Sequence, residues 1–332
     1  MRRRLAIIGL GMAVGPHAKS LVDLADRAEV IWACSPSEAR CRQFAQSFPF
    51  PTTTDVDRVL GDERVEALLL LTPPSTHVEL GGRALAAGKH LLIEKPVALT
   101  AREADGLVAL ARRHGRRLGV VLQYRFRDAS LRLAELIAAG GLGPLMTGDC
   151  RVQWWRPQSY YDEPGRGSFA RDGGGVLLTQ AIHTLDLFRS FVGGIEVIAG
   201  LAATTALHRM ECEDYAAALL RLGGGAPGCF TASTASFPGS AERIELVFAQ
   251  ATARLEGMSL EIHHHDGRQE SFGSSRPSGS GADPMQFAHD AHRGLIADFL
   301  DALDEERDPR ANGAEGAATQ HLIETILASA RN

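Results

Sequence analysis

The chain has 332 residues, of which 45% are hydrophobic and 23% are charged, and its formal net charge is −5. This composition is typical of a globular protein that is long enough for two domains. It argues against a nucleic-acid-binding protein, which would carry a basic stripe, and against a membrane protein, because no apolar stretch approaches the length of a transmembrane helix.

Cysteine and histidine spacing favours neither a disulfide framework nor a metal site. The five cysteines are an odd number without ligand spacing, and we interpret them as reduced thiols of a cytoplasmic protein. Residues 263–265 are three consecutive histidines. On a strand they would point alternately to opposite faces, so we predict a solvent-facing turn there and no metal.

The first predicted elements are a buried strand at residues 5–8, a glycine turn at 9–15 and a helix from about residue 13 to 24. Gly9 and Gly11 have the spacing of the first two glycines of a dinucleotide-binding fingerprint. One permits the tight turn, and the other lets the backbone approach a pyrophosphate at the helix N-terminus. The third position is Val14, with glycine displaced to Gly15, and this departure weakens the signal.

A second strand, residues 29–33, ends where an NAD enzyme usually offers an acid to the adenosine ribose. This chain instead offers Ser35, Ser37 and, one turn later, Arg40. Hydroxyls and a guanidinium suit a 2′-phosphate better than a bare diol, so the sequence favours NADP over NAD. The serines are also suited to capping the following helix, and both interpretations can hold together.

The next two strands lead to the candidate for chemistry. A near-continuous apolar run at residues 65–71 predicts a strand covered on both faces, and it ends in TPPSTH at 72–77. Another strand, residues 90–93, runs into Glu94, Lys95 and Pro96, where proline ends the ladder. Lys95 therefore follows the C-terminal end of a strand, where open parallel sheets bind ligands. The tripeptide alone fits a solvated surface lysine equally well.

A helix from residue 100 or 101 to 113 and a strand at 118–122 complete an alternation that predicts a doubly wound parallel sheet over residues 1–122. The rhythm changes from residue 123, with a helix at 130–139 and an alternating strand at 148–155. Residues 154–172 are rich in aromatic, arginine and glycine residues and lack a clear period. We interpret this long irregular loop as a lid or substrate wall.

Three glycines at 173–175 precede a segment with helical spacing of apolar residues. Thr179, His183 and Asp186 lie three or four residues apart, which predicts neighbouring positions on one helix surface. Alone, His183 would more often be a structural histidine than a base. The preceding glycines and the hydroxyl of Thr179 favour a functional role.

The remaining sequence predicts six short strands, a loop at 273–284 and two final helices at about 289–305 and 313–330. The strands are predicted at 196–205, 215–222, 228–236, 242–248, 252–256 and 260–264. Together they indicate an α/β domain with a large, mainly antiparallel open sheet, spanning residues 123–332. The final helices are compatible with packing back towards the first domain.

These motifs together resemble the Gfo/Idh/MocA oxidoreductase family, over essentially the whole chain. The resemblance rests on GLGMAVGPH, TPPSTH, AGKHLLIEKP, the segment around Arg125, and GGGVLLTQAIHTLD. It implies a Rossmann domain followed by an α/β domain whose open sheet often makes the interface of a homodimer or homotetramer. It also implies that Lys95 faces the nicotinamide and the substrate, with His183 as the proton acceptor. Many sugar and inositol dehydrogenases of the family have Asp where this chain has Thr179.

The resemblance thus implies hydride transfer between a nicotinamide and a hydroxyl or carbonyl carbon of a sugar, cyclitol or nucleotide-sugar-like substrate. His183 would take the hydroxyl proton, Lys95 would stabilise the developing charge, and Thr179 would contact a neighbouring hydroxyl. Two rival interpretations are an NAD-retaining glycosidase that uses transient oxidation, and a dinucleotide-binding sensor without turnover. Cofactor contacts are expected from Gly9, Gly11, Met12, Ala13, Ser35, Ser37, Arg40, Thr72, Pro73, His77, Glu94, Lys95 and Gln123. Substrate contacts are expected from Arg125, Trp155, Arg156, Tyr160, Tyr161, Arg171, Thr179 and His183.

Overall fold

The computed structural model describes residues 2–273 and 288–331. The chain forms two compact units, one made of Met1–Gln123 with Ala288–Ala318 and the other of Tyr124–Phe287 with Thr319–Asn332. The first unit therefore contains a C-terminal segment in addition to the predicted residues 1–122. Most of the predicted loop at 273–284 lies outside the described residues.

A six-stranded sheet forms the centre of the first unit, with the strand order β3-β2-β1-β4-β5-β6 and parallel pairing throughout. The apolar runs that form these strands are buried, as expected of a sheet covered on both faces. The predicted doubly wound sheet is confirmed, and the short β3 is an addition to it. The strands are β1 (Arg3–Ile8), β2 (Ala28–Cys34), β3 (Thr52–Thr53), β4 (Ala67–Leu70), β5 (His90–Ile93) and β6 (Leu118–Val120).

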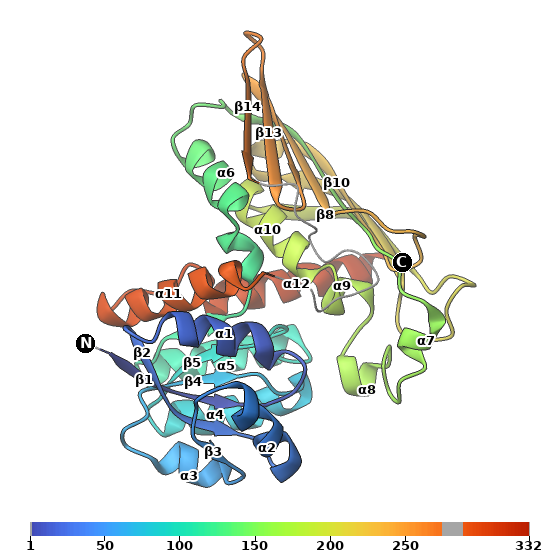
Figure 1. Cartoon of the computed structure of the whole chain (residues 1–332). Helices are drawn as coiled ribbons and strands as arrows, with labels where there is room; N and C mark the ends of the chain where they lie inside the picture. The colour runs from blue at the N-terminus through green and yellow to red at the C-terminus, as the bar shows by residue number, and fades with distance from the viewer. Residues whose placement is uncertain (1, 274–287, 332) are drawn as a thin grey trace. The chain divides into compact units, whose positions relative to one another are not determined.

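Helices connect these strands, and a C-terminal helix joins them (Figure 1). Thr100 caps α5 through a reciprocal bond with Glu103, which explains why that helix begins at Ala101. Helix α11 packs along α1 in the same unit. The helices are α1 (Val14–Asp23), α2 (Glu38–Ser47), α3 (Val56–Gly61), α4 (His77–Ala86), α5 (Ala101–Arg113) and α11 (Asp290–Asp304), with a 3-10 turn η1 (Pro74–Thr76) before α4.

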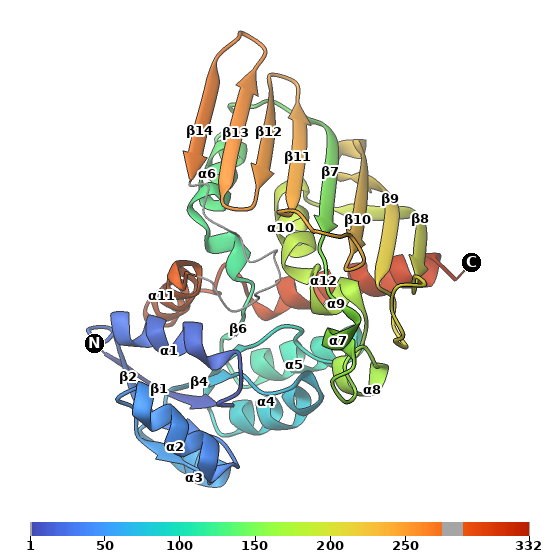
Figure 2. The same ribbon diagram turned by 45° about the vertical axis from the view of Figure 1, so that its right-hand side comes forward.

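An eight-stranded sheet forms the second unit, in the order β14-β13-β12-β11-β7-β10-β9-β8 (Figure 2). All neighbouring pairs are antiparallel except β7 with β10. The predicted mainly antiparallel sheet is confirmed, and β14 is an addition to it. The strands are β7 (Leu145–Gln153), β8 (Ile195–Ala203), β9 (Tyr215–Leu222), β10 (Pro227–Ser233), β11 (Arg243–Phe248), β12 (Ala251–Glu256), β13 (Ser259–His264) and β14 (Gln269–Gly273).

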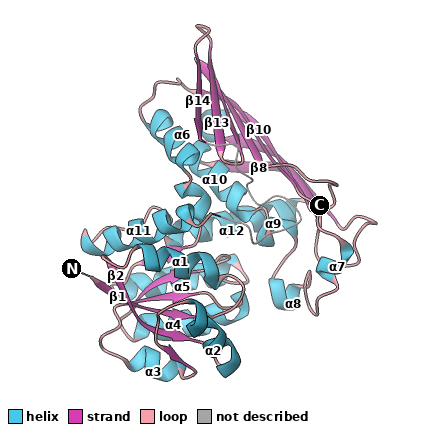
Figure 3. Ribbon diagram, viewed as in Figure 1, coloured by secondary structure: helices cyan, strands magenta, loops and turns pink. Residues whose placement is uncertain are grey.

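The described helices of this unit other than those of the 154–172 segment gather on one face of the sheet (Figure 3). They are α6 (Asp128–Ala138), α9 (Val176–Thr179), α10 (Ile182–Val192) and the second half of α12 (Gly313–Ser329). The core between helices and sheet contains the fully buried rings of Phe188 and Phe230. Along β9 burial alternates, so that Ala218 and Leu220 face this core while Leu219 points away from it.

Three details of the predicted second domain are wrong. The helix expected across Thr179, His183 and Asp186 is interrupted, because α9 ends at Thr179 and α10 begins at Ile182. His183 and Asp186 therefore share α10, whereas Thr179 does not belong to it. The loop at 154–172 contains two short helices, α7 (Gln158–Tyr161) and α8 (Phe169–Asp172). His263 and His264 end strand β13, as the predicted strand at 260–264 has it, so the turn predicted for the three histidines holds for His265 alone.

Candidate functional site

The glycine turn after β1 has the geometry of a dinucleotide cradle. Gly9 has φ +107°, and a Cβ there would lie 2.6 Å from the carbonyl carbon of Leu71, so only glycine fits. A Cβ on Gly11 would meet no atom within 4 Å, which leaves open space in front of the backbone before α1. Met12 is 69% exposed and Ala13 is the N-cap of α1, without a side-chain capping bond. The turn thus presents backbone rather than side chains to a pyrophosphate.

A second observation fits a polar ligand at the same sheet edge. Gln123 begins the 3-10 turn η2 (Gln123–Phe126), which follows β6. Its Oε1 atom is buried and has no hydrogen-bond partner among the described residues. A buried amide oxygen is costly without a donor, and a carboxamide or ribose hydroxyl would supply one. The cradle and this acceptor together fit a nicotinamide dinucleotide.

The serines after β2 hydrogen-bond to the backbone. The Ser37 N–H donates to Ser35 Oγ at 3.3 Å, and Ser37 Oγ accepts the Arg40 N–H at 3.4 Å as the N-cap of α2. The predicted capping role is therefore confirmed. Ser35 is buried, whereas the Arg40 side chain is exposed. Of the three predicted phosphate contacts, Arg40 is thus the most accessible.

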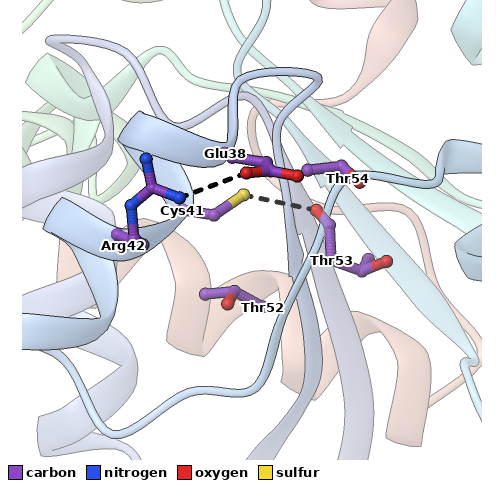
Figure 4. A pocket seen from close by; sticks show the side chains of 6 residues that line it. All are labelled: Glu38, Cys41, Arg42, Thr52, Thr53 and Thr54. Atoms are coloured by element: carbon purple, nitrogen blue, oxygen red, sulfur yellow. Dashed lines mark hydrogen bonds and ion pairs between the residues drawn. The ribbon is translucent and has the colours of Figure 1, made fainter.

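An open pocket of about 350 Å³ lies beside this turn, between α2 and β3 (Figure 4). Arg42 and Glu38 form an ion pair at 3.1 Å across its rim, and the Cys41 thiol donates to the Thr53 carbonyl oxygen at 3.4 Å. Because the arginine is neutralised by the glutamate, the rim offers no surplus positive charge to a phosphate. The lining residues are Glu38, Cys41, Arg42, Thr52, Thr53 and Thr54; none of them was predicted as a cofactor contact.

His77 connects the loops that follow β4 and β5. Its fully buried ring places Nε2 2.9 Å from Thr72 O and Nδ1 3.0 Å from Pro96 O. Burial lowers the pKa of His77, although both carbonyl oxygens favour the charged form. The ring therefore fixes the Thr72–Pro73 loop to the segment that contains Lys95, while Pro73 itself is exposed.

Lys95 is half-buried after the C-terminal end of β5, as the sequence predicts. Its backbone N–H donates to Glu94 Oε2 at 3.0 Å, and Glu94 Oε1 lies 3.1 Å from Nε2 of the buried His17. Burial opposes ionisation of Glu94, but His17 and the charges of Lys95 and His292 outweigh it, so the pKa of Glu94 is below its ordinary value. Lys95 is therefore flanked by a fixed carboxylate.

His17 and His292 were not predicted as part of this cluster. Their rings meet edge to face, with centroids 4.9 Å apart, where α11 packs on α1. His17 is visible in the motif GLGMAVGPH, on the first turns of the helix after the glycines. His292 lies almost two hundred residues from Lys95 in the chain, and no local pattern points to it.

His183 belongs to the second unit and is mostly buried in the first turn of α10. Its ring stacks on Tyr124, with centroids 5.0 Å apart and planes at 25°. Nearby, Arg125 donates to both oxygens of Asp186, at 2.6 and 2.7 Å, and Thr319 Oγ1 donates to the same carboxylate at 2.8 Å. Arg125, expected to bind substrate, thus forms a buried bidentate ion pair with α10.

The glycines before α9 allow a close contact with the backbone of Glu213. A Cβ on Gly175 would lie 1.9 Å from the carbonyl oxygen of Glu213. The Glu213 carboxylate accepts the N–H groups of Gly175 and Leu177, each at 3.1 Å. Burial raises the pKa of Glu213 despite these bonds. Thr179 Oγ1 donates to Gly175 O at 2.7 Å, so its hydroxyl is fixed at the end of α9.

The predicted substrate residues of the 154–172 segment have different environments. Arg156 is buried, with its guanidinium over the rings of Trp154 and Tyr160 at 5.4 and 5.7 Å. Tyr161 is buried and its hydroxyl lies 2.7 Å from Thr234 Oγ1. Only Trp155, Tyr160 and Arg171 are partly accessible. Arg171 donates to Glu163 at 2.7 Å.

A buried pair that the sequence did not indicate holds this segment. His208 Nδ1 lies 2.6 Å from Asp214 Oδ2, and its Nε2 lies 2.8 Å from the backbone oxygen of Arg156. Asp214 also accepts the N–H and the hydroxyl of Thr205, at 2.8 and 2.6 Å. These bonds fix the backbone at Arg156. Among the described residues, no group of three or more His, Cys, Asp or Glu side chains could hold a metal ion.

Two family models match the chain. One, described as "Oxidoreductase family, NAD-binding Rossmann fold", matches residues 3–122, and the other, described as "GFO/IDH/MocA C-terminal domain", matches residues 130–254. These two ranges contain the glycine turn and Lys95 in the first case, and His183 in the second.

Named relatives are similar over most of the chain. The D-apiose dehydrogenase of Paraburkholderia graminis is 27% identical over 336 residues, covering 98% of this chain and 87% of that protein. The scyllo-inositol 2-dehydrogenase (NAD(+)) of Bacillus subtilis is 27% identical over 251 residues, covering 74% and 71%. The WlbA dehydrogenase structure from Bordetella pertussis, in complex with NADH and UDP-GlcNAcA, has a TM-score of 0.83 at 27% identity, covering 100% of this chain and 96% of that one. The chain therefore belongs to the Gfo/Idh/MocA family of oxidoreductases.

Proposed function

We propose that this protein is an NAD(P)-dependent dehydrogenase that interconverts a hydroxyl and a carbonyl group on a sugar or cyclitol. The observation that carries the proposal is the presence, after strands of one parallel sheet, of a glycine cradle open at Gly11 and of Lys95 beside the fixed carboxylate of Glu94. Relatives named as dehydrogenases of D-apiose and scyllo-inositol support the substrate class.

The chemistry follows from what alcohol oxidation requires. The bound nicotinamide supplies the two-electron acceptor, or the donor in the reverse direction. His183 takes the hydroxyl proton, because imidazole changes protonation near neutral pH. The Lys95 ammonium holds the same oxygen and stabilises its developing negative charge. Thr179 contacts a neighbouring hydroxyl of the substrate.

The charge distribution favours a neutral substrate over a phosphorylated one. Arg125 is paired with Asp186, and Arg171 is paired with both Glu163 and Asp172. Arg156 is buried beneath aromatic rings, where its guanidinium and the accessible Trp155 and Tyr160 suit the polar edge and apolar face of a sugar ring. A nucleotide sugar, the ligand of the WlbA structure, is the second substrate class to test.

For the cofactor we propose a preference for NADP(H) over NAD(H). No acid stands at Ser35, and the exposed guanidinium of Arg40 follows the N-cap of α2, where a 2′-phosphate would also meet a helix N-terminus. The NADH complex of the WlbA dehydrogenase favours the opposite preference. Binding of the two dinucleotides to the purified protein decides between them.

We also propose a cytoplasmic homodimer or homotetramer. All five cysteines are free thiols, as a reducing compartment would keep them. On the face of the eight-stranded sheet opposite the helices, Leu201 and Leu219 are 56% and 59% exposed, in the neighbouring strands β8 and β9. Adjacent exposed leucines indicate a surface that another copy covers. In the part of the chain that the structure describes, no helix has the length and apolar character of a membrane span.

The experiment that tests this function is a dehydrogenase assay with D-apiose, scyllo-inositol, levoglucosan and UDP-GlcNAcA, each with NAD and with NADP. We expect stoichiometric reduction of the nicotinamide by a neutral substrate, and loss of single-turnover reduction in Lys95→Met. Lys19→Met, an exposed lysine of α1, is the matched control and keeps the wild-type rate. A Lys95→Met enzyme with the wild-type rate would refute the assignment.

The same assay separates the rival functions. Product formation without a net change in free nicotinamide would favour the NAD-retaining glycosidase. Dinucleotide binding without turnover of any substrate in a broad polyol and sugar panel would favour the sensor.

A further inference from the structure

The turn between the two halves of the chain contacts helix α10 at two points. Tyr124 stacks on His183, and the next residue, Arg125, is bound by both oxygens of Asp186. His183 and Asp186 are three residues apart in α10 and therefore lie on the same side of that helix. Consecutive residues of η2 contact these two positions. The ion pair between Arg125 and Asp186 thereby fixes the backbone at the preceding residue, Tyr124.

A second group, the guanidinium of Arg127, also lies against the Tyr124 ring. The guanidinium carbon of Arg127 lies 3.2 Å from the centroid of this ring. Arg127 is 5% exposed and its Nη1 donates to Glu242 Oε1 at 2.5 Å and to Gly257 O at 3.1 Å. Glu242 and Gly257 flank β11 and β12, so the guanidinium is fixed to the sheet. The phenol ring thus contacts both the guanidinium of Arg127 and the imidazole of His183.

We propose that Tyr124 is the positioning residue for His183, and that Arg127, fixed by Glu242, sets the position of Tyr124. The inference rests on the proposed role of His183 as proton acceptor. A base must present one ring nitrogen to the substrate hydroxyl within hydrogen-bond reach. An imidazole on a helix turns about two side-chain bonds, and a flat aromatic neighbour restricts the tilt of its ring. Tyr124 contributes through its ring, and its hydroxyl, whose pKa burial raises, stays protonated.

The test compares Tyr124→Leu with Tyr124→Phe, which keeps the ring, and with Phe126→Leu, which removes a buried aromatic from the same turn. We expect Tyr124→Leu to lower kcat by about 10- to 100-fold, the effect of misplacing a reacting group by about 1 Å. In Tyr124→Leu, the primary isotope effect on kcat for a substrate deuterated at the hydride-donating carbon rises. The affinity of the variant for the dinucleotide is unchanged. Tyr124→Phe and Phe126→Leu keep the wild-type kcat.

A spectroscopic measurement gives an answer that does not depend on the substrate. The carbon-bound ring protons of His183, assigned in proton–carbon correlation spectra by their absence in His183→Asn, are shifted upfield by the Tyr124 ring current in wild type. The shift persists in Tyr124→Phe and is lost in Tyr124→Leu. An unshifted His183 signal in the wild-type protein overturns the inference even if Tyr124→Leu fails to fold.

The two hypotheses fail differently. If His183→Asn keeps the wild-type rate, the proposed base is wrong, and the positioning role is overturned with it. If His183→Asn is inactive while Tyr124→Leu and Phe126→Leu are both as fast as wild type, the base stands and Tyr124 does not position it.

Discussion

Nε2 of His17 lies 3.1 Å from Oε1 of Glu94, although 77 residues separate them in the chain. His17 is on α1, directly after the glycine cradle, and Glu94 precedes Lys95. The other carboxylate oxygen of Glu94 accepts the backbone N–H of Lys95. The helix after the glycine cradle and the segment that contains the lysine are thus connected through one buried imidazole.

His17→Leu should destabilise the protein in a pH-dependent way. The pKa of Glu94 is lower in the folded protein than its unfolded value of about 4.3, so its ionisation contributes stability above that pH, which is lost as the pH falls through the folded pKa. We expect the variant to lose about 1.5–3 kcal/mol at pH 7, the range for hydrogen bonds to charged groups. The difference in the free energy of unfolding between the variant and the wild type becomes smaller as the pH falls below the unfolded pKa of Glu94.

Urea unfolding at neutral and acidic pH measures this, with His114→Leu, at the exposed C-cap of α5, as control. A loss of stability that does not change with pH would contradict the contribution of Glu94.

Alanine substitutions at the two glycines of the cradle should have different effects, one on folding and the other on cofactor binding. Gly9→Ala brings a Cβ against the Leu71 backbone at a positive φ and is expected to cost at least about 1–3 kcal/mol. Gly11→Ala has open space around its Cβ and is expected to fold normally while binding the dinucleotide more weakly, because the methyl group occupies the approach of the pyrophosphate.

Thermal unfolding without cofactor and dinucleotide titration measure the two effects. Gly15→Ala, in α1 and with no atom within 4 Å of its Cβ apart from its chain neighbours, is the control and should bind the dinucleotide as the wild type does. Equal loss of binding in Gly11→Ala and Gly15→Ala would show that the pyrophosphate does not approach Gly11.

The buried pair of Arg127 and Glu242 should show strong non-additivity. Their side chains are 5% and 4% exposed, so removing either charge leaves the other uncompensated. We expect Arg127→Met and Glu242→Leu each to cost about 3–5 kcal/mol, and the double variant to be more stable than either. A double-mutant cycle by urea unfolding tests this, and additive losses would contradict it. The comparison is the accessible ion pair between Arg243 in β11 and Glu256 in β12. We expect its coupling energy to be less than about 1 kcal/mol.

Arg40→Ala should weaken NADP(H) and leave NAD(H) unchanged. A guanidinium that binds a 2′-phosphate contributes about 1.5–3 kcal/mol, so we expect a loss of at least about tenfold in NADP(H) affinity. Arg42→Ala, next to it but paired with Glu38, is the matched control. Calorimetric titration with both dinucleotides gives the result. Equal weakening of NAD(H) binding would show that Arg40 does not contact the 2′-phosphate. Tighter binding of NAD(H) than of NADP(H) by the wild-type protein would refute the proposed cofactor preference.

Leu219→Glu should dissociate the proposed oligomer. A carboxylate within an apolar interface loses its hydration without a partner, which is strongly unfavourable. We expect sedimentation to show a wild-type dimer or tetramer and a folded monomeric variant. Leu207→Glu, a similarly exposed leucine outside the sheet, keeps the wild-type assembly. A monomeric wild type would exclude this role of the sheet.

Both sheets were predictable because their strands are marked by local patterns. Continuous apolar runs identified β1, β4 and β5, and alternation identified β7. The two strands that were missed, β3 and β14, are short or have no buried residue, so hydrophobic periodicity carries no signal for them. Their place in each sheet is determined by the neighbouring strand.

By itself, the sequence determined the glycine cradle, the lysine after β5 and the glycine-led segment before His183, because each depends on the backbone conformation of consecutive residues. Tertiary structure alone decided the interruption before α10, the pairing of Arg125 with Asp186 across 61 residues, and the contact of His17 with Glu94. The physical reason is that backbone hydrogen bonding and burial are encoded within a few residues, whereas the partner of a buried charged side chain is selected by which elements pack together.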